Sequence, residues 1–199
     1  MKIFVNFLSA CRIAIAFLLI PTIMLKMYWL AFVLYLLGAA SDWFDGFLAR
    51  KYKCCSKLGG VLDHIGDKLL VCNTFIMMAL MAPTWAVVIP VILMIARELY
   101  ISGLREFLGT QKIEMPVPKA RFSIGKIKTT IQMIASTLFL LFFAIFTSIT
   151  PTTNSRFVFY LISRLPDAFV FCLWFALVAS LWSATQYTFT FAQKLKKIK

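Results

Sequence analysis

The chain has 199 residues, of which 61% are hydrophobic and 15% are charged, and its formal net charge is +13. Soluble domains are about 45–50% apolar and about 25% charged, so a water-soluble globule is excluded, and so is a disordered chain, which needs low hydrophobicity. Long apolar runs also argue against a nucleic-acid-binding protein. The composition therefore predicts an integral membrane protein whose basic residues lie at the membrane surface.

Six apolar stretches are each long enough to cross a bilayer, whose hydrocarbon core takes roughly 20 helical residues. In chain order they cover about 4–25, 29–50, 59–82, 85–108, 123–149 and 167–190. Because they use most of the chain, we expect one all-α membrane domain over residues 1–199, with six transmembrane helices.

Basic residues gather in the connections that six spans would place on one side of the membrane. Lys2, the loops 50–57 and 105–128, and the tail 194–199 hold 15 of the 21 lysines and arginines. Positively charged loops remain in the cytoplasm, so both termini are expected there.

Four aspartates interrupt the second and third expected spans, where charge is costly and points to function. Asp42 and Asp45 are three residues apart, and Asp63 and Asp67 are four apart, so each pair shares a helix face. A short loop joins the two helices, and the four carboxylates would repel each other unless divalent cations neutralised them. Oxygen ligands favour Mg²⁺ or Mn²⁺. The alternative is four solvated carboxylates that pair with loop lysines.

Small residues and one arginine accompany these aspartates. Small side chains let helices or a ligand approach closely, and Arg50, about one turn beyond Asp45, can clamp a phosphate through two hydrogen bonds. Together the residues fit the pattern D-x2-D-G-x2-A-R-x8-G-x3-D-x3-D without a gap. Its members are Asp42, Asp45, Gly46, Ala49, Arg50, Gly59, Asp63 and Asp67.

This pattern resembles the signature of the CDP-alcohol phosphotransferase family. The resemblance implies a six-helix membrane enzyme, usually a homodimer, that transfers a substituted phosphoryl group from a CDP-linked donor to an alcohol and releases CMP. It implies that the four aspartates hold one or two metal ions on the donor's diphosphate in a polar cavity, and that Asp67 is also the general base. By the same resemblance, Gly46, Ala49, Arg50 and Gly59 line the CDP-donor site.

A second group of charges lies at the end of the fourth expected span and the start of the fifth. Arg97 and Arg105 can share a helix face two turns apart, and Lys126 and Lys128 begin the next span on the same side. These four cations predict a pocket for an acceptor that carries a phosphate. Two alternatives stay open: Arg97 pairs with Glu98 as a buried structural pair, and the other cations are ordinary membrane-interface residues.

The segments A-R-E-x5-L-R-E and G-K-x-K-T-T-x-Q-M are similar to those of one branch of the family, the bacterial phosphatidylglycerophosphate synthases. That similarity implies CDP-diacylglycerol and sn-glycerol 3-phosphate as substrates, and a bacterial inner membrane with the site facing the cytoplasm. Alternatives are a cardiolipin synthase, another CDP-diacylglycerol-dependent transferase, or, from a different class, a small cation transporter. The last expected span carries no readable motif.

Overall fold

The computed structural model describes residues 2–52, 57–110, 124–148 and 156–196, and nearly all of them are helical. The six helices are α1 (Lys2–Met24), α2 (Tyr28–Tyr52), α3 (Lys57–Met81), α4 (Trp85–Thr110), α5 (Ile124–Ser148) and α6 (Arg156–Lys196). The first five begin and end within two residues of the predicted spans. The prediction of an all-helical membrane fold is confirmed.

Five of the described helices contain an apolar stretch long enough to cross a membrane. In α2 the described side chains form a shorter apolar stretch, Tyr28–Ser41, and the side chains from residue 42 to the end of this helix lie outside the described residues. The rest of α2 carries the first half of the aspartate motif. Polar residues therefore occupy part of this helix. Within a membrane, polar groups are tolerated only where they face protein or a polar cavity.

The last helix is longer than predicted. The expected span was 167–190, but α6 begins at Arg156 and ends at Lys196, with Pro166 inside it. A proline interrupts only one hydrogen bond of the ladder, and the residues before it are mostly apolar, so the helix continues through it. Its 41 residues extend about 61 Å at 1.5 Å per residue, roughly twice the thickness of the hydrocarbon core.

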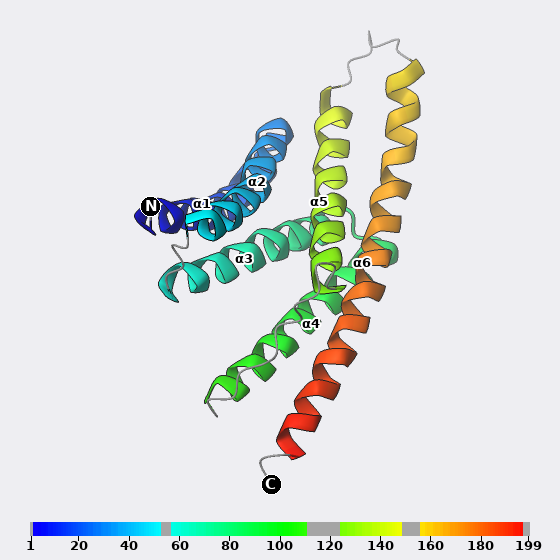
Figure 1. Cartoon of the computed structure of the whole chain (residues 1–199). Coiled ribbons are helices and arrows are strands. Elements are labelled where there is room, and N and C mark those ends of the chain that lie inside the picture. The colour runs from blue at the N-terminus through cyan, green and yellow to red at the C-terminus, as the bar shows by residue number, and fades with distance from the viewer. Residues whose placement is uncertain (1, 53–56, 111–123, 149–155, 197–199) are drawn as a thin grey trace.

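The helices form two groups that meet at α3 (Figure 1). In the first, α1 packs against α2 and α3; in the second, α6 packs along α5 and also against α4. Contacts of α2 with α5, and of α3 with α4 and α5, join the groups. The core is built from apolar side chains of all six helices, among them Leu19, Tyr35, Leu70, Met94, Phe139 and Leu173.

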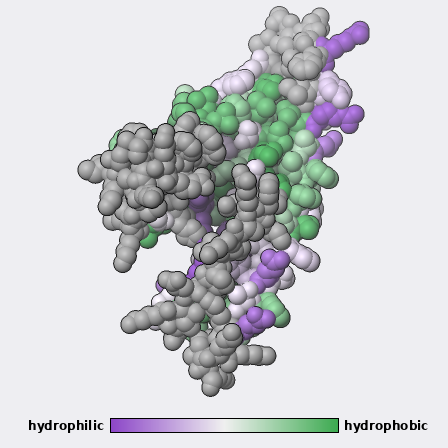
Figure 2. Space-filling model, viewed as in Figure 1, coloured by the Kyte–Doolittle hydropathy of each residue, from purple (hydrophilic) through white to green (hydrophobic). Residues whose placement is uncertain are grey.

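Large apolar side chains also cover much of the outside. On α6, the side chains of Phe171, Val178 and Trp182 are each more than half exposed. Figure 2 shows hydrophobic residues over the middle of α5 and α6, with hydrophilic residues toward the ends. In water such a surface would drive aggregation, whereas in a bilayer it faces lipid, as the composition predicts.

Gly38 allows the first three helices to approach closely. A Cβ atom at this position would lie 3.1 Å from Leu70 Cδ1 on α3 and 3.4 Å from Ile15 Cγ2 on α1. Leu70 is fully buried, so it has little room to retreat. The missing side chain therefore sets the spacing of the group that carries the aspartates.

We expect Gly38→Val to lower the thermal stability of the protein in detergent, because overpacking a tight contact costs roughly 1–3 kcal/mol. The matched control is Gly103→Val on α4, where a Cβ atom would meet nothing within 4 Å. Thermal unfolding of both variants measures the difference. Equal midpoints for the two would contradict the close approach at Gly38.

Candidate functional site

The aspartate motif lies on two consecutive helices that contact each other. Asp42 and Asp45 belong to the second half of α2, and Asp63 and Asp67 to the first half of α3. Only Asp67 has a described side chain; those of Asp42, Asp45 and Asp63 lie outside the described residues. So do the side-chain surroundings of Gly46, Ala49 and Arg50, whereas Gly59 is buried near the start of α3.

Asp67 is held by an arginine of the first helix. Arg12 Nη1 donates to Asp67 Oδ1 at 2.5 Å, and Arg12 Nε donates to Ser41 Oγ at 3.2 Å. The Arg12 side chain is fully buried, while that of Asp67 is 32% exposed. Arg12 thus neutralises and orients the carboxylate from the protein side and leaves it accessible from the other. Sequence reasoning assigned no role to Arg12 and did not predict this contact.

The contact depends on the residue before Asp67. A Cβ atom at Gly66 would lie 3.3 Å from Arg12 Cδ and 3.6 Å from the carbonyl oxygen of Ser9. The absence of a side chain at Gly66 therefore lets α1 lie close to α3. At that distance the Arg12 side chain reaches along α3 to the carboxylate.

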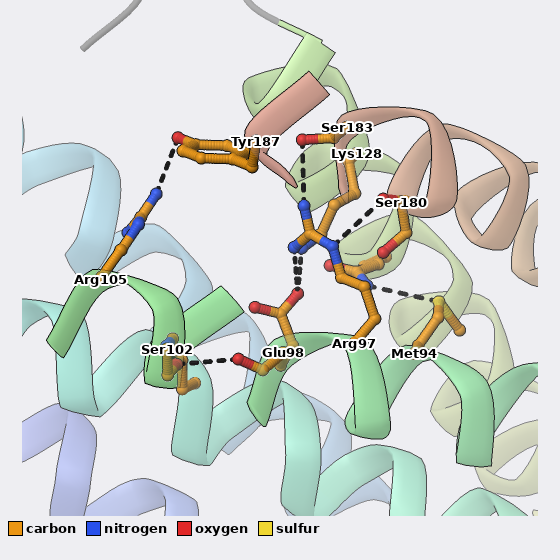
Figure 3. A network of polar contacts seen from close by, with 11 residues as sticks. Met94, Arg97, Glu98, Ser102, Arg105, Lys128, Ser180, Ser183 and Tyr187 are labelled. Carbon is orange, nitrogen blue, oxygen red and sulfur yellow. Dashed lines mark hydrogen bonds and ion pairs between the residues drawn. The ribbon is translucent and has the colours of Figure 1, made fainter. Parts of the chain in front are cut away.

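A second polar group lies between α4, α5 and α6 and centres on Glu98 (Figure 3). Glu98 Oε1 accepts from Arg97 Nη1 at 3.1 Å and also from Lys128 Nζ. Arg97 further donates through Nε to the carbonyl oxygen of Ser180 at 3.1 Å and through Nη2 to Ser183 Oγ at 3.0 Å. With this many partners, Arg97 matches the alternative of a buried structural pair with Glu98.

Lys68 connects the two polar groups. It follows Asp67 on α3, and its ammonium donates to Ser102 Oγ on α4. Ser102 in turn donates to the backbone oxygen of Glu98 at 2.8 Å. The residue next to Asp67 in the sequence therefore reaches the polar group around Glu98 through Ser102, while the Asp67 carboxylate itself contacts Arg12 on α1.

Arg105 lies apart from this buried group. Its Nη2 donates to the Tyr187 hydroxyl at 2.8 Å, and its guanidinium carbon is 5.0 Å from the centre of the same ring. Figure 3 shows the Arg105 side chain pointing toward Tyr187 on α6, to one side of the residues that contact Glu98. Of the four predicted phosphate-binding cations, Arg97 and Lys128 come together and exposed Arg105 remains at the edge. Lys126 has no described side chain.

The sixth helix contributes to this site, although no motif was read in its sequence. Ser180, Ser183 and Tyr187 all contact arginines of α4. Their spacing of three and four residues places them on one helix face. Regular polar positions in an apolar helix were the available signal, but serine and tyrosine are common enough in membrane helices to be overlooked.

A known family matches almost the full length of the chain. The sequence profile described as CDP-alcohol phosphatidyltransferase matches residues 2–182. The chain belongs to this family. The match covers all six helices except the last turns of α6, so it includes Asp67 and Glu98 but ends before Ser183 and Tyr187.

Several curated bacterial proteins are similar to the chain. The CDP-diacylglycerol–glycerol-3-phosphate 3-phosphatidyltransferase of Rickettsia bellii is 39% identical over 143 residues, which is 68% of this chain and 74% of that protein. The protein of the same name from Rickettsia typhi is 38% identical over 148 residues, 71% of this chain and 78% of the relative. That from Sodalis glossinidius is 41% identical over 103 residues, 52% and 56% of the two chains.

We expect Arg12→Met to destabilise the protein, because it leaves the partly buried carboxylate of Asp67 without this cation, at a cost on the order of 1–3 kcal/mol. Asp67→Asn should also destabilise, since it removes charge from the partner of a fully buried guanidinium. The double variant should lose clearly less than the sum of the two, because each change removes the same interaction. Thermal unfolding of the four proteins in detergent tests this, and additive losses would mean that the pair is not coupled.

Proposed function

We propose that the chain is a membrane enzyme that transfers a phosphatidyl group from CDP-diacylglycerol to sn-glycerol 3-phosphate, giving phosphatidylglycerophosphate and CMP. Its family membership and the names of its relatives support this reaction. The observation that carries the proposal is that Lys68, which directly follows Asp67 on α3, donates to Ser102 at the edge of the Glu98 cluster. A carboxylate and a group of cations on neighbouring residues suit an acceptor that has both a hydroxyl and a phosphate.

The aspartates suit a hard divalent cation. They supply only oxygen ligands from two helices in contact, and the described member, Asp67, is fixed in orientation by Arg12. We propose that Asp42, Asp45, Asp63 and Asp67 hold one or two Mg²⁺ or Mn²⁺ ions. When bound, the metal would neutralise the diphosphate of the donor and stabilise the CMP leaving group.

Asp67 is the proposed general base. Its carboxylate takes the proton of the acceptor's 1-hydroxyl while that oxygen forms a bond to the β-phosphorus of CDP-diacylglycerol. The bond from that phosphorus to the bridging oxygen breaks, and CMP leaves with the electron pair. Arg12 keeps the carboxylate in one orientation, which favours proton transfer because a base acts only at hydrogen-bond distance.

The remaining residues bind the two substrates. Gly46, Ala49, Arg50 and Gly59 are proposed for the CDP part of the donor. Lys128 and Arg97 supply positive charge for the acceptor phosphate, and Arg105 and Lys126 attract it at the edge of the site. Each of the three guanidinium nitrogens of Arg97 already donates to Glu98, Ser180 or Ser183, so we propose that Arg97 contributes through its positive field and by holding Glu98.

The distribution of charge suggests how the protein is oriented in its membrane. We propose a bacterial inner membrane, with both termini and the polar cavity on the cytoplasmic side, where glycerol 3-phosphate and CMP are dissolved. The basic loops support this orientation through the positive-inside rule. The diacyl chains of the donor remain in the bilayer. A homodimer is proposed from family resemblance.

The experiment is to supply purified protein with labelled CDP-diacylglycerol, Mg²⁺ and a set of acceptors, and to measure CMP release. We expect release with glycerol 3-phosphate and little with glycerol, serine, inositol phosphate or phosphatidylglycerol. Release with phosphatidylglycerol alone would move the assignment to cardiolipin synthesis. An absence of release with every acceptor would refute the enzyme proposal.

Asp67→Asn should lower kcat by at least a hundredfold, because removing a general base typically costs 10² to 10⁴ in rate. Binding of CDP-diacylglycerol should be largely retained, since three other aspartates remain. The matched control is Asp167→Asn, at an exposed position of α6, which should leave kcat unchanged. Steady-state rates and donor binding are measured together, and a rate within tenfold of the original would reject Asp67 as the base.

A further inference from the structure

The charges around Glu98 do not balance. Among the described residues, Arg97, Lys128 and Lys68 surround this region with three positive charges, and Glu98 supplies one negative charge. Asp67 is not available to compensate, because the buried guanidinium of Arg12 already pairs with it. Counted over the described side chains, the cluster therefore has an excess of two positive charges within apolar helices, where uncompensated charge is costly.

Among the described side chains, Lys68 is the cation of this cluster that has no carboxylate partner. The Arg97 and Lys128 side chains both form ion pairs with Glu98. Within the part of the chain that the structure describes, Lys68 instead donates to the neutral hydroxyl of Ser102 and forms no ion pair. Lys68 interacts with Glu98 and Arg105 through electrostatics alone, without a hydrogen bond to either side chain. One contact also leaves two of the three ammonium hydrogens for another acceptor.

We propose that Lys68 binds the phosphate of the acceptor, and that Glu98 adjusts the charge of the cluster to that of one phosphate monoester. This inference rests on the proposed function and adds a residue that determines acceptor specificity. A phosphate monoester carries about −1.5 to −2 charges near pH 7, which matches the excess of two. A phosphodiester carries one, and an uncharged alcohol none, so both would leave the cluster unbalanced.

The position of Lys68 on α3 suits this role. Asp67 and Lys68 are consecutive, so their Cα atoms are about 3.8 Å apart, and their side chains diverge toward α1 and α4. Glycerol 3-phosphate carries a hydroxyl and a phosphate at opposite ends of three carbons. A phosphate that replaces Ser102 as the partner of Lys68 would hold the hydroxyl end near the Asp67 carboxylate, which is the orientation that transfer needs.

The test compares Lys68→Met, which keeps the length and apolar stem of the side chain, with Lys68→Arg, which keeps its charge. We expect Lys68→Met to raise the KM for glycerol 3-phosphate at least tenfold, with the KM for CDP-diacylglycerol unchanged. Lys68→Arg should stay within about threefold of the original. Inorganic phosphate, used as a competitor of glycerol 3-phosphate, should lose inhibitory strength in Lys68→Met by a similar factor.

The matched control is Lys26→Met, which removes the same charge from the turn between α1 and α2. Trp29 Nε1 donates to Ser148 Oγ at 2.6 Å, so this turn lies at the far end of α5 from Lys128. Its acceptor KM should not change. A direct readout without turnover is phosphate binding followed by ³¹P NMR, which should weaken in Lys68→Met and not in Lys26→Met.

Each failure has its own signature. If the original protein releases no CMP with glycerol 3-phosphate, the proposed function is wrong. If it does, and Lys68→Met lowers kcat while the acceptor KM and phosphate binding stay unchanged, the phosphate-binding role is overturned and Lys68 acts on Asp67 instead. If Lys68→Met does not fold, Lys68→Gln replaces it, and an unchanged KM in that variant would equally overturn the proposal.

Discussion

The polar interior of this bundle depends on the carboxylate of Glu98. A charge at membrane depth needs partners, because neither lipid nor a distant solvent can stabilise it. Glu98 receives Arg97 from its own helix and Lys128 from α5. With that support, Arg97 directs its remaining donors to α6. Three helices are thus joined by one acidic side chain, and their arrangement follows from the need to pair its charge.

The third helix divides the site into two halves with different electrostatics. Toward α1, Asp67 meets a buried arginine that offsets the charge of a single carboxylate. Toward α4, Lys68 approaches a cluster that retains positive charge. Two consecutive residues therefore point to regions of different charge. This difference supports the proposal that a donor with its metal binds on one side of α3 and an acceptor phosphate on the other.

Much of the fold could be predicted from the sequence, because the apolar stretches have the length that a bilayer demands, and five helices begin and end within two residues of the predicted positions. The sixth differs because Pro166 and the charges around it resemble a loop, whereas a helix tolerates them when neighbouring residues are apolar. At the site, the order of the spans predicted that Arg97 and Lys128 come together, because the fourth span ends and the fifth begins on the same side of the membrane. It could not predict which partner each would take, since that depends on contacts between helices far apart in the sequence.

The same limit explains the residues that sequence reasoning missed. Arg12 and Asp67 are 55 positions apart, and Arg97 and Ser183 are 86 apart. Nothing local distinguishes Ser183 from any other membrane serine. The acidic motif was readable because its members are charged, close in sequence and placed where charge is rare. Neutral partners of charged residues lack all three properties.

The contact between Arg97 and α6 also has a consequence for the biosynthesis of the protein. Ser180 follows Arg97 by 83 positions, so α4 enters the membrane well before the helix that supplies these partners has been synthesised. Until then, two of the donors of Arg97 lack their final acceptors, and Glu98 on the same helix is the partner that α4 itself supplies. The polar centre is therefore completed late, when α6 joins the other helices. A nascent chain that stopped short of Ser180 would leave these donors without acceptors inside the membrane, where an unpaired polar group is costly.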